Sequence, residues 1–416
     1  MQVKRKLLAL MNVIGGKMTN KIKLASLALA LSLVFVGCGN QAAKEAGQKA
    51  ENVAEEAKDA AEDAKDKAED AAEEAKDKAE DAAEDAKEAA EEAKDAAEDR
   101  VEDLKANFEG KLVLRRSLEA PHGEGSFARV AVVTDGDKIV DASIDEFQYF
   151  DEGSDFLALP NQDSDTEFKK GAKEGKFLGS KLMNTEAYSK LMTEKAKSTV
   201  SIADNFKAIQ DFAKGKTIDE LKEVVDGAED GKAIDAVTGA TLVDTKGYLE
   251  AIIETAQEDD NAVAFEGDPA KIKVQQFFGT AGANNAVTDT FVVVEDGKIV
   301  AASIDELQYI GEDGVPNSDK KFGENYADPA KKLSSKLENN EEYSKMMKDM
   351  AKATKKLDEN YKAIEECVVG KTPEEIKEVI DANENGKAVD AVTGATLNNT
   401  VGYLEEIYKA ATKEDK

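Results

Sequence analysis

The sequence is poor in the side chains that most often hold zinc or haem. It contains one histidine, His122, two cysteines, Cys38 and Cys367, and no tryptophan. Because such sites are usually built from clusters of His and Cys, neither kind of site is expected. Cys367 aligns with Phe212 of an internal repeat described below, which predicts a small apolar side chain of the core rather than a redox group.

Basic residues are also few relative to acidic ones. The chain has 56 Lys and Arg against 87 Asp and Glu, a net charge of −31 at pH 7. Such a charge favours solubility and repels nucleic acid and anionic lipid, so we expect no nucleic-acid partner. Residues 1–37 carry six basic and no acidic side chains, and a chain without them is more acidic still.

No apolar run reaches the roughly 20 residues that a membrane-spanning helix needs. The longest candidate, residues 24–36, follows Lys21 and Lys23 and ends in Phe35-Val-Gly-Cys38. This arrangement is typical of a lipoprotein export signal, so residues 1–37 are predicted to be a signal peptide and Cys38 the lipidated residue. The mature chain would then be anchored by lipid, such as palmitate, to the outer face of the cell membrane, and Cys367 would have no partner for an intramolecular disulfide. The alternative is a signal anchor that stays in the membrane.

The first residues of the chain look superfluous to this signal. Gly15-Gly-Lys-Met18 can be encoded by a ribosome-binding site followed by a start codon. We therefore expect Met18 to be the true start.

Residues 38–109 contain a long tract of Ala, Glu, Asp and Lys. Alanines recur at steps of three and four from Ala54 to Ala96, and no Pro or Gly lies between Gln48 and Glu109. Alanine, glutamate and lysine are strong helix formers, and a stripe of alanine makes only a weak apolar seam. The tract predicts a semi-rigid helical spacer or a weak coiled coil, with a disordered acidic tail as the alternative.

Two similar segments follow, residues 110–258 (repeat 1) and 269–412 (repeat 2). Residues 135–149 match 296–309, residues 184–192 match 339–347, and Gly215-Lys-Thr matches Gly370-Lys-Thr. Asp-Gly between apolar runs predicts β-hairpins, and the second matching pair predicts helices. We expect an α+β fold in each repeat: a small antiparallel sheet, several short helices, a loop and a closing helix. Gly-Lys-Thr lacks the first glycine of a phosphate-binding P-loop, so Thr217 and Thr372 are predicted to begin capping boxes instead.

The most informative feature stands near the end of each repeat. Asp-Ala-Val-Thr-Gly-Ala-Thr-Leu occurs at 235–242 and again at 390–397. A loop of small residues that ends in a hydroxyl before a helix N-terminus is well suited to hold a phosphate, since backbone N–H groups and the helix dipole favour an anion there.

This motif resembles the acceptor sequence of the covalent FMN-binding domain family, found in flavinylated subunits of sodium-pumping and Rnf-type redox complexes and in extracellular flavolipoproteins. In that family a Mg²⁺-dependent flavin transferase takes FMN from FAD and joins its phosphate to the last threonine of the motif. The resemblance implies two covalent FMN groups, on Thr241 and Thr396. It also implies that Asp235 and Asp390 complete the sequence that the transferase recognises, an Asx-type turn being the structural alternative. The remaining motif residues shape the loops: Thr238, Gly239, Ala240, Thr393, Gly394 and Ala395.

Other flavin contacts are proposed by position alone. With no tryptophan present, an aromatic contact to the flavin ring must come from Phe or Tyr. The candidates lie at the predicted strand ends, Gln148, Tyr149, Gln308 and Tyr309. Lys181 and Lys336 are candidates to approach the phosphate or the reduced ring. Core packing or a surface position is the competing interpretation for all six.

Taken with the lipid anchor, the resemblance extends to PplA-type extracellular flavolipoproteins of Gram-positive bacteria. It implies electron transfer rather than a substrate-specific enzyme. Electrons would pass from a membrane quinone-linked dehydrogenase system through FMN to external acceptors such as ferric iron. Two other functions stay open: a surface binding or adhesion lipoprotein that keeps the motif as structure, and a flavin-dependent reductase of one soluble substrate.

Overall fold

The computed structural model describes residues 108–311 and 313–413. The predicted signal peptide, Cys38 and the predicted spacer lie outside this part of the chain. The described residues form an α+β structure with eight α-helices and two antiparallel sheets. None of these helices is both long and apolar enough to cross a membrane.

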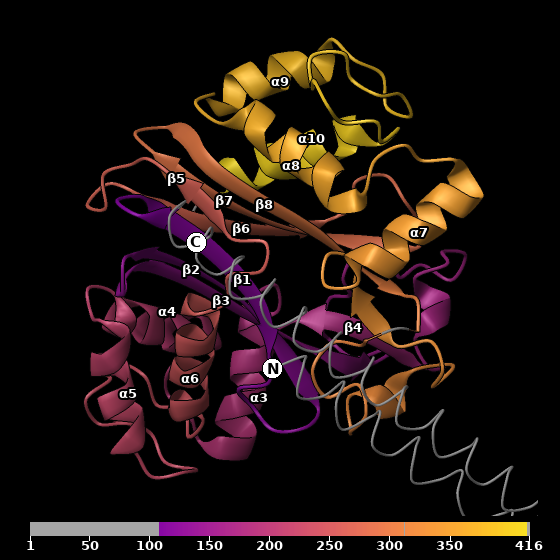
Figure 1. Ribbon diagram of the computed structural model, residues 1–416. Helices are drawn as coiled ribbons and strands as arrows, with labels where there is room; N and C mark the ends of the chain where they lie inside the picture. Colours follow the sequence, from indigo (N-terminus) through magenta and orange to yellow (C-terminus); the bar gives the residue numbers. More distant parts are fainter. Residues whose placement is uncertain (1–107, 312, 414–416) are drawn as a thin grey trace, which may run out of the picture. The chain divides into compact units, whose positions relative to one another are not determined.

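Repeat 1 begins with a sheet and ends with helices that cover one face of it (Figure 1). The strands lie in the order β4-β3-β2-β1, and a short strand from the linker, β5 (Val263–Phe265), pairs with the edge of β1. The bounds of the remaining elements are β1 (Leu112–Glu119), β2 (Ser126–Asp135), β3 (Lys138–Asp151), the 3-10 turn η1 (Lys169–Gly171), β4 (Lys176–Ser180), α3 (Thr185–Ala196), α4 (Ile202–Ala213), α5 (Ile218–Asp226) and α6 (Thr245–Ala256).

Repeat 2 has the same order of elements, with strand order β6-β7-β8-β9. The elements are β6 (Lys273–Gly279), β7 (Ala286–Glu295), β8 (Lys298–Tyr309), η2 (Gly323–Asn325), β9 (Leu333–Ser335), α7 (Asn340–Ala351), α8 (Leu357–Val368), α9 (Pro373–Asp381) and α10 (Thr400–Ala411). The expected hairpins, helices and capping boxes are confirmed: Thr217 and Thr372 each exchange hydrogen bonds with the glutamate three residues later.

Each sheet is buried on both faces. On β2, Ala128, Val130 and Val132 pack with the helices of repeat 1. The alternating residues Phe127, Ala131 and Val133 pack instead against the sheet of repeat 2. Successive side chains of a strand point to opposite faces, so a strand covered on both sides carries a nearly continuous apolar run. The two repeats therefore have separate helix-side cores and share the cores between their sheets.

Equivalent residues of the two repeats make reciprocal contacts across this shared core. The Asn161 side-chain amide donates to the carbonyls of Ala283 and Ala286, and Asn317 donates in the same way to Gly123 and Ser126. The hydroxyls of Tyr149 and Tyr309 lie 2.5 Å apart. These pairs relate the repeats by an approximate twofold axis, as in an isologous dimer.

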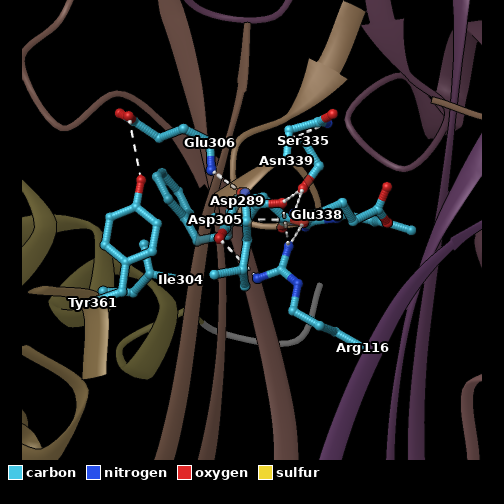
Figure 2. Close-up of polar contacts among 12 residues, drawn as sticks. Arg116, Asp289, Ile304, Asp305, Glu306, Ser335, Glu338, Asn339 and Tyr361 are labelled. Carbon is cyan, nitrogen blue, oxygen red and sulfur yellow. Dashed lines mark hydrogen bonds and ion pairs between the residues drawn. The ribbon is translucent and has the colours of Figure 1, made fainter. Parts of the chain in front are cut away.

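At one pair of equivalent positions the two repeats carry side chains of opposite charge. Arg129 on β2 forms an ion pair with Asp289 on β7, and Arg116 on β1 pairs with the other oxygen of Asp289. Figure 2 shows Arg116 reaching this cluster beside Asp305. All of these side chains are buried. Burying a charge is costly unless it is paired, so Arg at this position in one repeat is matched by Asp at the equivalent position in the other.

Candidate functional site

The two motif segments, acceptor loop 1 (residues 235–241) and acceptor loop 2 (390–396), have the same conformation. Each consists of two consecutive turns: the amide of Val237 donates to Ile234 and that of Ala240 to Val237, with equivalent bonds at Val392 and Ala395. Val237 and Val392 are buried, which anchors each loop to its helix-side core. The last threonine of each motif, Thr241 and Thr396, is exposed.

A buried asparagine holds each of these threonines. The side-chain oxygen of Asn205 accepts from the backbone amide of Thr241 at 2.7 Å and lies 3.4 Å from its hydroxyl. Asn360 accepts from the amide of Thr396 at 2.7 Å and from its hydroxyl at 3.1 Å. Each asparagine donates in turn to a carbonyl at the start of its own helix, Ser201 or Lys356. The two motif hydroxyls are thus exposed but held in place. The motif alone did not reveal that Asn205 and Asn360 have this role.

The glycine of each loop is required by the backbone. Gly239 has φ +97° and Gly394 has φ +105°, in the region that L side chains rarely adopt. A Cβ atom at either position would also lie 3.3 Å from an alanine Cβ of the adjacent helix, Ala208 or Ala363. The loop backbone therefore lies directly on the helix, which leaves the threonine two residues later facing outward.

Asp235 and Asp390 are exposed, and no other described residue forms a hydrogen bond or ion pair with either carboxylate. The amide two residues later, which an Asx turn would use, bonds to the backbone of Ile234 or Val389 instead. The Asx-turn alternative is therefore not formed. Both carboxylates are free for an external partner.

The helices that follow the loops lie close to the turn between the first two strands of each sheet. A Cβ atom at Gly247 would be 2.2 Å from the carbonyl oxygen of Pro121, and one at Gly402 would be 2.2 Å from that of Ala281. Only glycine permits this approach, which explains the shared Gly-Tyr-Leu-Glu sequence of α6 and α10. It fixes the N-terminus of each helix beside its acceptor loop.

Lys181 and Lys336, predicted as possible phosphate contacts, are buried in ion pairs. Lys181 Nζ lies 2.7 Å from Glu146, and Lys336 Nζ lies 2.6 Å from Glu306. Burial lowers the pKa of Lys181, but Glu146 and Tyr188 together outweigh it, so the pKa lies above its ordinary value; Glu306 and Tyr343 do the same for Lys336. Among the described residues, neither ammonium forms a hydrogen bond or ion pair with the exposed threonines.

The strand-end candidates divide between the two faces of each sheet. Gln148 lies on the helix side, where its side-chain oxygen accepts from the hydroxyl of Tyr188 at 3.5 Å. Gln308 is half-buried at the equivalent position. Tyr149 and Tyr309 belong to the shared core and bond to each other, so the structure turns them away from the helix side, where the acceptor loops lie.

The surroundings of the two loops differ. In repeat 1, His122 Nδ1 lies 2.6 Å from Asp244, the residue before α6, and this hydrogen bond lowers the pKa of Asp244. The equivalent residues of repeat 2 are Gly282 and Asn399. Repeat 2 instead places the amine of Lys355 3.4 Å from a Cβ position at Gly394. The two motif threonines therefore have similar backbone settings but different charged neighbours.

Comparison of the chain with models of protein families, with curated proteins and with solved structures finds no match. The site must therefore be judged by its own chemistry. Within the described residues no group of His, Cys, Asp and Glu could hold a metal ion. The residues do fit a covalently attached phosphate ester: each loop presents an exposed, positioned hydroxyl on a glycine-containing turn at a helix N-terminus.

Proposed function

We propose that this chain is an extracellular electron-transfer flavoprotein that carries two covalent FMN groups, on Thr241 and Thr396. The observation that carries the proposal is the duplicated acceptor geometry. Each repeat presents an exposed threonine hydroxyl, held by a buried asparagine, six residues after an exposed aspartate with no partner in the described chain. Bound FMN would supply the electron chemistry, and the protein supplies attachment, orientation and electrostatics.

The proposed attachment needs an external enzyme. A flavin transferase would move the FMN part of FAD to the threonine oxygen, with AMP as the leaving group and the hydroxyl proton released. Asn205 and Asn360 hold the two oxygens in position for this step. Asp235 and Asp390 would be read by the transferase, because their carboxylates have no role within the described structure.

The wider assignment rests on the predicted lipid anchor and on the family resemblance. The chain would receive electrons from a membrane quinone-linked dehydrogenase system and pass them to external acceptors such as ferric iron. A lipid anchor on Cys38 would hold it to the outer face of the membrane. A covalent bond suits such a location, since an exported protein cannot replace a lost flavin from the cytosol.

Covalent attachment is tested first. Protein co-produced with a flavin transferase should remain yellow after unfolding and desalting. Thr241→Ala and Thr396→Ala should each remove half of the colour, and the double variant all of it. Colour that washes out on unfolding contradicts covalent attachment. A folded protein without any flavin colour leaves the binding or adhesion function as the alternative.

Acceptor choice then separates a relay from a reductase. A relay only has to bring the flavin edge near an acceptor, whereas a reductase must bind one substrate in a shaped pocket. Reduced protein should be reoxidised by several unrelated acceptors, including soluble ferric complexes. Because the chain is strongly acidic, salt should slow oxidation by cationic acceptors and speed it by anionic ferric chelates. Fast reoxidation by one organic substrate alone would favour the reductase.

A further inference from the structure

A groove of about 430 Å³ lies between helix α4 and acceptor loop 1. One wall is the face of α4 that carries Ala208 and Phe212, and the other is formed by Thr238 and Gly239 of the loop. Thr241, the proposed attachment point, follows Gly239 by two residues and is exposed. The groove is thus lined by the same loop that carries the proposed attachment point.

The groove has apolar walls that a planar aromatic ring could contact. The loop backbone lies directly on the helix here, with a Cβ position at Gly239 only 3.3 Å from Ala208. Phe212 is half-buried, and the Lys216 ammonium lies 3.9 Å from its ring centroid, so a flavin ring would meet the other face or the edge. The charged side chains that line the same groove are Asp204, Asp211 and Lys207, and the last two form an ion pair.

Repeat 2 has the same helix face and loop with one informative difference. The residues equivalent to Ala208 and Phe212 are Ala363 and Cys367 on α8. Cys367 is a free, half-buried thiol, and its Sγ lies 3.8 Å from the carbonyl oxygen of Ala391 in acceptor loop 2. Cys367 therefore borders acceptor loop 2 as Phe212 borders acceptor loop 1.

We propose that each flavin ring docks between its acceptor loop and the preceding helix, against Phe212 in repeat 1 and against Cys367 in repeat 2. This inference rests on the proposed function, because the occupant is the isoalloxazine ring of FMN attached to Thr241 or Thr396. The ribityl chain joins phosphate to ring, so a ring tethered at these threonines needs a surface within reach, and the groove provides one. The two rings would then have different neighbours, a phenyl group and a thiol.

The absence of tryptophan from the chain makes a direct test possible. Tryptophan in contact with a flavin ring quenches its fluorescence by electron transfer. In the Thr396→Ala background, which keeps only the flavin on Thr241, Phe212→Trp should lower the flavin fluorescence yield severalfold and Cys367→Trp should not. In the Thr241→Ala background the pattern should reverse.

Each variant serves as the matched control for the other, since both carry the same new side chain on equivalent helices. Intact mass confirms that FMN is attached, and circular dichroism confirms that each variant is folded. Attached FMN with no difference between the two tryptophan positions overturns the docking proposal while leaving the proposed function intact. Absence of attached FMN from the parent chain is a failure of the proposed function and is seen in the mass alone.

Reactivity of the natural thiol gives an independent readout. A thiol reagent should label Cys367 more slowly when Thr396 carries FMN than in the same chain made without the transferase. Loading of Thr241 alone, in the Thr396→Ala variant, should leave the labelling rate unchanged. Peptide mass mapping assigns the label to Cys367 and separates it from Cys38. Equal labelling of Cys367 in FMN-loaded and FMN-free chains contradicts the docking of a ring against this residue.

Discussion

Replacing Asp289 with alanine should destabilise the shared core more than any exposed substitution. Asp289 is fully buried, and its two oxygens pair with Arg129 and Arg116. After Asp289→Ala, Arg116 keeps only Asp305 at 3.8 Å, and Arg129 is left without its ion-pair partner. Removing one partner of a buried pair costs about 3–5 kcal/mol, a large part of a typical unfolding free energy of roughly 5–15 kcal/mol.

Urea unfolding of the full chain, followed by circular dichroism, measures this loss as a lower midpoint. Adding Arg129→Met to Asp289→Ala should recover part of the stability, because the double variant no longer buries an unpaired guanidinium at this position. Asp381→Ala, which breaks the exposed Lys377–Asp381 pair, is the control and should cost less than about 1 kcal/mol. A loss below about 1 kcal/mol for Asp289→Ala, or strictly additive effects of the two core changes, would refute the charge-paired packing of the two sheets.

Three further predictions follow from the acceptor loops and from one buried carboxyl. Asn205→Ala should leave the Thr241 amide without its partner and lower the free energy of unfolding by about 1–3 kcal/mol. Peptide mass mapping should show less FMN at Thr241 and unchanged FMN at Thr396. Full loading of Thr241 would show that Asn205 does not position it. Gly394→Ala should cost about 1–2 kcal/mol in thermal or urea unfolding, because its φ of +105° lies where an alanine is strained, and an unchanged midpoint would contradict the loop geometry. Burial raises the pKa of Glu365 from its ordinary value of 4.5 to about 7. The folded chain therefore binds the carboxyl proton more tightly than the unfolded chain does. The free energy of unfolding should fall as pH rises from 4.5 through about 7. Glu365→Gln, the residue type found at the equivalent Gln210, should flatten this fall by about 3 kcal/mol in a pH series of urea unfolding. An equally steep fall in the variant would contradict it.

The turns and helix ends were predictable because a few neighbouring residues determine them. Asp-Gly turns, the capping boxes at Thr217 and Thr372, and the helices after the acceptor loops all depend on neighbouring residues. The sequence was not interpreted as placing β2 between two layers, although its residues on both sides of Arg129 are mostly apolar. The ion-pair partner of Arg129 lies in the other repeat, so the local sequence does not reveal it.

The sequence motif names the two proposed attachment residues but not the residues that hold them. The motif names Thr241 and Thr396, yet Asn205 and Asn360 lie far from them in sequence and contact them only through the packing of α4 and α8. Lys181 and Lys336 were proposed as groups that could approach the phosphate or the reduced ring, and the structure pairs them with Glu146 and Glu306. Long-range pairing of this kind cannot be deduced from local spacing.

The intact mass of the mature chain, co-produced with a flavin transferase, tests the central claim most directly. The proposal predicts a mass increase of two FMN phosphoester groups, with one group located by fragmentation on Thr241 and the other on Thr396. Thr241→Ser, which keeps a hydroxyl, is the matched control for Thr241→Ala and should retain more of the modification. An unmodified mass in the presence of an active transferase, or FMN found on other residues, would contradict the account.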